Sequence, residues 1–254
     1  MALDRKVNNI LSKQVEEKYH PDTVLEKKPC SLSREKLIVI GSSTGGTEAL
    51  NKILSTLPSK GLPPIVIVQH IPKMFSSSLT ARLDSNSQLQ VFEINSKVQL
   101  QNDCVYVANG DSHALLSYKE GKYYVAPFEA NRVSRHRPSV DILFRSANNI
   151  SGKNTLAIIL TGMGDDGMIG MKELFDNGAY TIAQDEQTCV VFGMPKKAIE
   201  IGAVREILPL QQIPKRIMDY ASNKINLLKP KEPDINTPNI LSATSEEKDS
   251  DKEN

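Results

Sequence analysis

Three residues of the types that build a serine-hydrolase triad lie in three loops, each of which follows a short apolar run. Ser43 lies in the glycine-rich loop 41–46, His70 follows the run 65–68, and Asp166 lies in the loop 161–167. A serine hydroxyl is a weak nucleophile until a histidine accepts its proton, and that histidine needs a carboxylate to fix its tautomer. The three residue types therefore meet the chemical requirements of acyl transfer.

Each loop also has a structural explanation. Gly41, Ser43 and Gly45 match Gly-x-Ser-x-Gly, which presents a serine on a sharp turn, but Ser and Thr at a helix start also act as caps. A lone histidine after a buried strand is often only a hydrogen-bonding residue. Asp165 and Asp166 could bind a metal, but carboxylates are also favourable at a helix N-terminus, where they interact with the helix dipole. No clear set of further ligands accompanies them, so we expect no metal.

Nucleotide binding at the glycine loop is disfavoured. A P-loop has Lys and Ser/Thr after its last glycine, whereas Thr47 and Glu48 follow Gly46 here. A dinucleotide-binding loop has a second glycine at the position that Ser43 occupies. The sequence therefore predicts no nucleotide cofactor.

Strands that alternate with helices would bring the three loops together. Apolar runs of strand length occur at 37–40, 65–68, 91–94, 104–108, 156–160 and 179–183, and helical patterns at 47–57, 139–148, 168–176 and 195–201. Such strands indicate a parallel sheet covered on both faces. We expect an α/β fold, a doubly wound three-layer α/β/α sandwich with a mainly parallel sheet and a peripheral β-hairpin at 114–125. In such folds function collects at the carboxyl ends of the strands, where the three loops lie.

Composition divides the chain and excludes several classes of protein. Residues 1–35 are expected to be a polar N-terminal extension or linker, 36–228 a globular domain, and 229–254 a disordered acidic tail. The balance of 31 Lys+Arg against 30 Asp+Glu removes the electrostatic case for nucleic-acid binding. No apolar run is long enough to span a bilayer, and no signal peptide is recognisable. Three scattered Cys favour a cytoplasmic protein with free thiols.

Five motifs, in order, resemble those of the CheB-family chemotaxis protein-glutamate methylesterases over residues 36–217. They are LIVIGSSTGGTEAL (37–50), VQHIP (68–72), NRVSRHRPSVDILFRSA (131–147), LTGMGDDGM (160–168) and VFGMPKKAIEIGAV (191–204). The resemblance implies that 36–228 is a methylesterase catalytic domain. It implies hydrolysis of glutamate γ-methyl esters on the cytoplasmic helices of methyl-accepting chemotaxis receptors, deamidation of receptor glutamines, and no cofactor.

The resemblance assigns roles to individual residues of this sequence. It makes Ser43 the nucleophile, His70 the general base and Asp166 the carboxylate that orients His70. Thr44 and Met163 would donate their backbone N–H groups to the oxyanion.

Other positions differ from the family's usual residues or are candidates for substrate binding. Asp165 and Ser42 stand where the family often has Asn and Ala, and we expect both differences to be tolerated. Arg132, Arg135 and Arg137 are candidates for pairing with acidic receptor helices, and a solvated basic turn is the alternative.

Two other functions share these residues. The first is a general serine esterase acting on small esters through a deep apolar pocket, although the chain order Ser, His, Asp differs from that of α/β-hydrolases. The second is a non-catalytic adaptor that docks to receptors, against which the joint presence of Ser43, His70 and Asp166 argues. Residues 1–35 are too short for the receiver domain of full-length family members. Regulation would then fall to a separate phosphorylated receiver protein or a histidine kinase.

Overall fold

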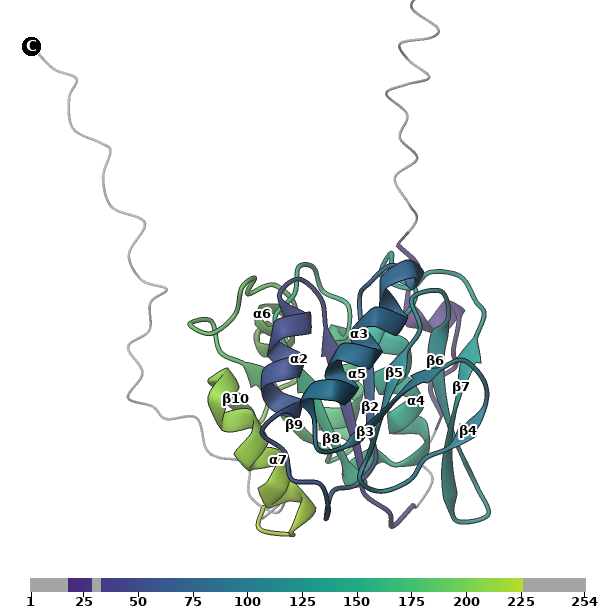
Figure 1. Cartoon of the computed structure of the whole chain (residues 1–254). Coiled ribbons are helices and arrows are strands. Elements are labelled where there is room, and N and C mark those ends of the chain that lie inside the picture. Colours follow the sequence, from purple (N-terminus) through teal and green to yellow (C-terminus); the bar gives the residue numbers. More distant parts are fainter. Residues whose placement is uncertain (1–17, 29–32, 226–254) are drawn as a thin grey trace, which may run out of the picture.

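The computed structural model of the chain describes residues 18–28 and 33–225 (Figure 1). Much of the predicted N-terminal extension and the whole predicted acidic tail, 229–254, lie outside these ranges.

Within the described ranges, seven parallel strands form a central sheet in the order β10-β9-β8-β1-β2-β5-β3. They are β1 (Leu37–Ser42), β2 (Ile65–Gln69), β3 (Gln90–Ile94), β5 (Cys104–Ala108), β8 (Thr155–Ile159), β9 (Tyr180–Gln184) and β10 (Glu206–Leu208). From β1 the chain builds one half of the sheet through β2 and the other half through β8, so the strand order reverses between β1 and β8. Ligands of open α/β sheets bind beyond the carboxyl ends of the strands at such a reversal.

Helices cover both faces of this sheet (Figure 1). One face carries α2 (Gly46–Leu54), α3 (Lys73–Asn86) and α7 (Ile213–Ala221), and the other carries α4 (Val140–Ile150), α5 (Met168–Asp176) and α6 (Met194–Glu200). Along β1, Ile38 and Ile40 pack into the core beneath α2, α3 and α7. Leu37 and Val39 pack into the core beneath α4, α5 and α6. Because both faces are buried, the strand is apolar from Leu37 to Ile40, and the polar Ser42 stands only at its carboxyl end. The predicted three-layer α/β/α fold is confirmed.

A small antiparallel sheet flanks the central one. It consists of β4 (Val98–Gln99), β7 (Lys122–Phe128) and β6 (His113–Lys119), in that order. The turn between β6 and β7 has Glu120 and Gly121 at φ of 53° and 77°, which suits the right-handed twist of a two-residue hairpin. The predicted hairpin is confirmed, and β4 extends it by one strand.

Residues 18–28, which we call the N-terminal segment, lie against α4. The segment contains the short 3-10 helix η1 (Pro21–Thr23). The buried Arg145 guanidinium donates to Asp22 Oδ1 at 2.5 Å and to the Leu25 carbonyl at 2.9 Å. Part of the predicted polar extension is therefore packed onto the domain. None of the described helices has the length and apolar character that a membrane span needs.

Candidate active site

The register of β1 and β2 places Ser43 and His70 side by side. The paired strands end with Ser42 opposite Gln69, and the His70 N–H donates to the Ser42 carbonyl at 3.0 Å. The Gln69 side chain ties the two strand ends together, because it accepts from Ser42 Oγ at 2.7 Å and donates to the Ser43 carbonyl at 2.9 Å. Both residues therefore lie at the carboxyl edge of the sheet, one step beyond the last pair.

Two glycines allow the first and third loops to close around Ser43. A Cβ at Gly46 would lie 2.1 Å from Gln69 Oε1, and a Cβ at Gly162 would lie 2.7 Å from Ser43 Cβ. The N-cap of α2 is Gly45, with no side-chain cap hydrogen bond. Ser43 is therefore not a helix cap, which was the structural alternative for this serine.

Asp166 lies fully buried beside His70 and holds the amino end of α4. His70 Nε2 lies 2.7 Å from Asp166 Oδ2, and the carboxylate also accepts from Ser139 Oγ at 2.7 Å, Val140 N at 2.7 Å and Asp141 N at 3.0 Å. Burial would raise the pKa of Asp166, but the hydrogen bonds and the charge of His70 outweigh it and lower the pKa. Asp166 is therefore ionised, and it caps α4 rather than α5, the helix that follows it.

Asp141 is a second buried carboxyl group behind Asp166. Its Oδ1 accepts from the Gly170 N–H at 2.9 Å, and its Oδ2 from Ser134 Oγ at 3.3 Å. Burial and the nearby charge of Asp166 raise the pKa of Asp141 well above its ordinary value. We therefore assign Asp141 as the protonated member of this pair.

We expect Asp141→Asn to become more stable relative to the wild type as the pH rises from about 4 towards neutrality. The folded wild type keeps a proton on Asp141 that the unfolded chain releases, so its free energy of unfolding falls across this interval. The amide does not titrate and can still accept from Gly170. Urea unfolding of both proteins at several pH values measures the difference, and a difference that stays constant with pH would contradict the assignment.

The second ring nitrogen of His70 is available for a proton. Asp166 is ionised and accepts only, so Nε2 carries the hydrogen of the neutral ring and Nδ1 carries the lone pair. Nδ1 is buried and has no hydrogen-bond partner among the described residues. It is the nitrogen that would accept a proton from a neighbouring serine hydroxyl.

His136 lies against His70, a contact that the sequence did not predict. The two rings are stacked with centroids 3.7 Å apart and planes 8° apart. Burial, followed by the charge of His70, lowers the pKa of His136 to about 4. The only signal in the sequence is the position of His136 within the motif 131–147, between Arg135 and Arg137.

The predicted oxyanion donors flank Ser43. Thr44 follows it directly, and Met163 follows Gly162, whose backbone lies against Ser43. The Thr161 hydroxyl donates to the Thr44 carbonyl at 2.9 Å and so ties the two loops together. Within 18–28 and 33–225, neither the Thr44 N–H nor the Met163 N–H donates a hydrogen bond to another described residue. Both groups are open to a ligand.

The three arginines take different positions. Arg132 and Arg137 line a cavity of about 310 Å³ that also borders His70 and His136. Arg137 donates to the Ala130 carbonyl at 3.1 Å. Arg135 is exposed and does not line this cavity.

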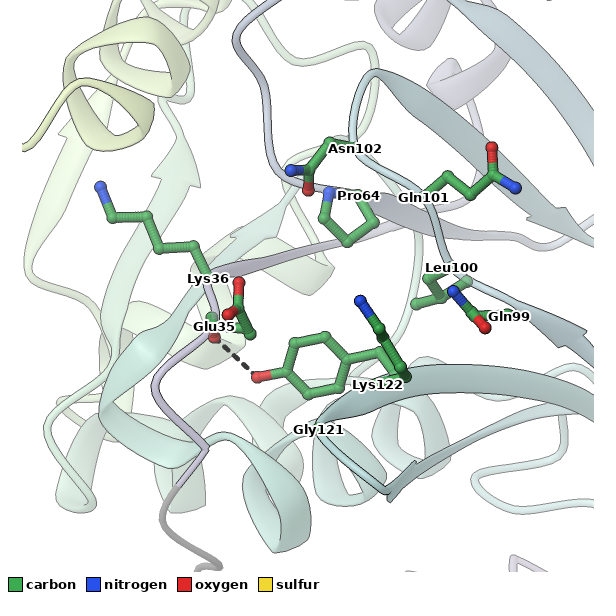
Figure 2. A pocket seen from close by; sticks show the side chains of 10 residues that line it. Glu35, Lys36, Pro64, Gln99, Leu100, Gln101, Asn102, Gly121 and Lys122 are labelled. Atoms are coloured by element: carbon green, nitrogen blue, oxygen red, sulfur yellow. Dashed lines mark hydrogen bonds between the residues drawn. The ribbon is translucent and has the colours of Figure 1, made fainter.

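A second cavity, of about 300 Å³, lies away from these residues (Figure 2). It is lined by residues that precede β1, β2 and β5 and by the β6–β7 hairpin, including Lys36, Pro64, Asn102 and Lys122. It therefore sits at the amino ends of the strands, opposite the candidate site. In the described part of the chain, no group of three or more His, Cys, Asp or Glu side chains is arranged to hold a metal ion.

Comparison with known proteins identifies the family. The family model for CheB methylesterase matches residues 38–217. The chain belongs to the CheB methylesterase family. The crystal structure of the Thermotoga maritima CheB methylesterase catalytic domain matches with a TM-score of 0.70 and 42% identity, covering 73% of this chain and 98% of that chain. The predicted family is confirmed.

Curated relatives carry two activities in their names. The chain is 45% identical over 217 residues to protein-glutamate methylesterase/protein-glutamine glutaminase 3 of Geobacter metallireducens, covering 84% of this chain and 61% of that protein. It is 51% identical over 176 residues to protein-glutamate methylesterase/protein-glutamine glutaminase 2 of Oleidesulfovibrio alaskensis, covering 69% of this chain and 49% of that protein. This CheB-family chain thus spans between 49% and 61% of the length of these two relatives.

Proposed function

We propose that this chain hydrolyses glutamate γ-methyl esters on chemotaxis receptors, releasing methanol, and that it deamidates receptor glutamines to glutamate. The observation that carries the proposal is the 2.7 Å contact between His70 and Asp166. It leaves Nδ1 of the ring unpartnered at the edge where the register places Ser43. Membership of the CheB methylesterase family supplies the class of ester.

The proposed reaction is acyl transfer through Ser43. Ser43 Oγ attacks the γ-carbonyl carbon while His70 Nδ1 takes the hydroxyl proton, and Asp166 stabilises the resulting imidazolium. The C–O bond to the methoxy group then breaks, and the proton on Nδ1 passes to the departing oxygen to give methanol. Water attacks the acyl carbon while His70 Nδ1 takes a proton from it; the bond from that carbon to Ser43 Oγ then breaks, and His70 returns the proton to Ser43 Oγ as the glutamate side chain is released. A glutamine follows the same path with ammonia as the leaving group.

Two backbone groups would stabilise the negative charge that develops on the carbonyl oxygen. Thr44 and Met163 flank Ser43, and their N–H groups make no hydrogen bond to another described residue. One donor of this kind contributes about 3–4 kcal/mol to transition-state stabilisation. The Gly162 contact with Ser43 supports this role, because it holds the third loop against the nucleophile.

The partners follow from the substrate. The substrate helices of methyl-accepting receptors lie in the cytoplasm, so we propose that this chain acts there. A separate phosphorylated receiver protein or a histidine kinase is the proposed regulatory partner.

Release of methanol from methylated receptor by the wild-type chain tests the substrate class. The proposal predicts release from the receptor, and ammonia from a receptor that carries glutamine at the same positions. Hydrolysis of small esters with none of the receptor would favour the general esterase. Receptor binding without any hydrolysis would favour the adaptor.

Charge reversal at Arg132 is expected to raise the apparent KM for methylated receptor about tenfold, with little change in kcat. Arg132 lines the cavity beside His70, where an acidic segment next to the esterified glutamate would lie. Steady-state kinetics of Arg132→Glu measures the effect. Arg135→Glu is the matched control, since Arg135 lies outside this cavity, and equal effects of the two variants would contradict the placement.

A further inference from the structure

A single hydrogen bond fixes one edge of the His70 ring but not its plane. Nε2 contacts Asp166 at 2.7 Å, whereas Nδ1 has no hydrogen-bond partner in the described ranges. An imidazole that is bonded to Cβ and held at Nε2 by one hydrogen bond can still tilt by rotation about the Cβ–Cγ bond. Any tilt moves Nδ1 away from the serine that it must deprotonate, and proton transfer requires close alignment.

His136 supplies the contact that fixes the plane. Its ring lies 3.7 Å from the His70 ring and within 8° of parallel. Both rings border the same cavity, whose other lining residues include Ile71 and Pro138. A flat face at this distance restricts tilting of His70 without occupying either of its nitrogens.

The loop that carries His136 is held in a conformation that is uncommon for its residues. Ser134 and Arg135 have φ of 51° and 70°, in the left-handed region that favours glycine. Val133 and His136 exchange backbone hydrogen bonds at 3.0 and 2.8 Å. Such conformations persist only where the surroundings enforce them, and they gather at functional sites.

The N-terminal segment contributes to the same loop. The Ser134 N–H donates to the Tyr19 carbonyl at 3.0 Å, and Tyr19 pairs with Val133 in a parallel bridge. Lys18, next to Tyr19, forms an ion pair with Asp165, which neighbours Asp166. The position of the His136 ring is thus set by contacts from two distant parts of the chain.

The charge state of His136 suits a stacking partner. Burial and the neighbouring His70 lower its pKa to about 4, so the ring is neutral near pH 7. A neutral ring does not repel the imidazolium that forms on His70 during the reaction. It also excludes water from that face of His70.

We propose that His136 is a positioning residue, whose stacked ring holds the plane of His70 so that Nδ1 faces Ser43 while Nε2 stays on Asp166. The inference rests on the proposed function for its substrate, but not for its geometry. His136 itself transfers no proton. What it supplies is a flat, uncharged face.

Two variants of similar size separate a flat face from mere volume. We expect His136→Leu to lower kcat for the methyl ester about 10- to 100-fold with little change in KM, because small misplacements of reacting groups cost this much. We expect His136→Phe, which keeps a flat face without a titratable nitrogen, to stay within about threefold of the wild type. Phe92→Leu, at an exposed ring on the edge strand β3, is the matched control and should change neither constant.

A second readout does not depend on the receptor. The rate at which a fluorophosphonate labels Ser43 reports activation of the serine by His70, and it should fall in His136→Leu and be kept in His136→Phe. Thermal unfolding of each variant shows whether it is folded. If the wild type is labelled at Ser43 yet leaves methylated receptor intact, the proposed function fails, and the labelling rates still decide the role of His136.

Three results would overturn the inference. The first is an unchanged kcat and labelling rate in a folded His136→Leu variant. The second is a folded His136→Phe variant that is as impaired as His136→Leu, which would indicate that the nitrogens of His136 act directly. The third is a change in KM alone, which would assign His136 to substrate binding.

Discussion

Replacing Ser43 by alanine is expected to lower hydrolysis of the methyl ester by about 10⁵- to 10⁶-fold, because serine and its base act as one unit in such triads. The fold should be retained, because the Ser43 hydroxyl makes no hydrogen bond within the described residues, and the backbone contacts of Ser43 to Thr161 and Gln69 do not involve it. Methanol release measures the activity, and thermal unfolding measures the stability.

Ser42→Ala is the matched control for this prediction. Ser42 is buried, and its hydroxyl donates to Gln69 at 2.7 Å, so its loss should reduce the free energy of unfolding by roughly 1 kcal/mol. Methanol release should remain within about tenfold of the wild type, since Ser42 only supports the strand ends. The assignment of the nucleophile would be wrong if Ser42→Ala abolished activity and Ser43→Ala kept it.

Asp166→Asn is expected to combine a catalytic loss of about 10⁴-fold with a loss of stability, since an amide in this position favours the wrong histidine tautomer. The carboxylate accepts from His70, Ser139, Val140 and Asp141. An asparagine offers one oxygen to these donors, and its NH₂ group must face at least one of them. Each donor left without a partner costs roughly 1–3 kcal/mol, so the midpoint of thermal unfolding should fall together with kcat.

Asp165→Asn separates the two neighbouring carboxylates. Asp165 is partly exposed and pairs with Lys18 at the surface, where ion pairs contribute about 1 kcal/mol or less. Its removal should therefore change kcat and the unfolding midpoint little. A severe loss of kcat in Asp165→Asn, with kcat unchanged in Asp166→Asn, would indicate that Asp165 rather than Asp166 orients His70.

The pattern of apolar runs was sufficient to predict six of the seven strands of the central sheet. Because β1, β2, β5, β8 and β9 are buried on both faces, most of their residues are apolar, and polar residues occur chiefly at their ends. The strand β10 and the helix α7 were not predicted. The three residues of β10, Glu206–Leu208, include an exposed Ile207, and α7 has charged residues among its buried ones. Short or amphipathic elements at the edge of a sheet depend on tertiary contacts that local patterns do not contain.

The candidate site was predictable in part, for a related reason. Ser43, His70 and Asp166 each follow a buried strand, so the rule that function gathers at carboxyl ends found all three. His136 lies in the loop between β7 and α4, which follows a strand of the small antiparallel sheet rather than a buried strand of the central sheet. Its place over His70 depends on two left-handed residues and on Tyr19, more than a hundred positions away. Such placement follows from the packed fold rather than from local sequence.

Identifying the residue that becomes covalently modified tests whether Ser43 is the nucleophile of methyl-ester hydrolysis. The chain would be treated with a fluorophosphonate ester, digested and analysed by mass spectrometry, while methanol release from methylated receptor is followed in parallel. We expect one phosphonyl group on Ser43, with activity lost in proportion to labelling and labelling strongly slowed in Asp166→Asn. Continued methanol release from a fully labelled Ser43, or labelling confined to another serine as activity disappears, would contradict it.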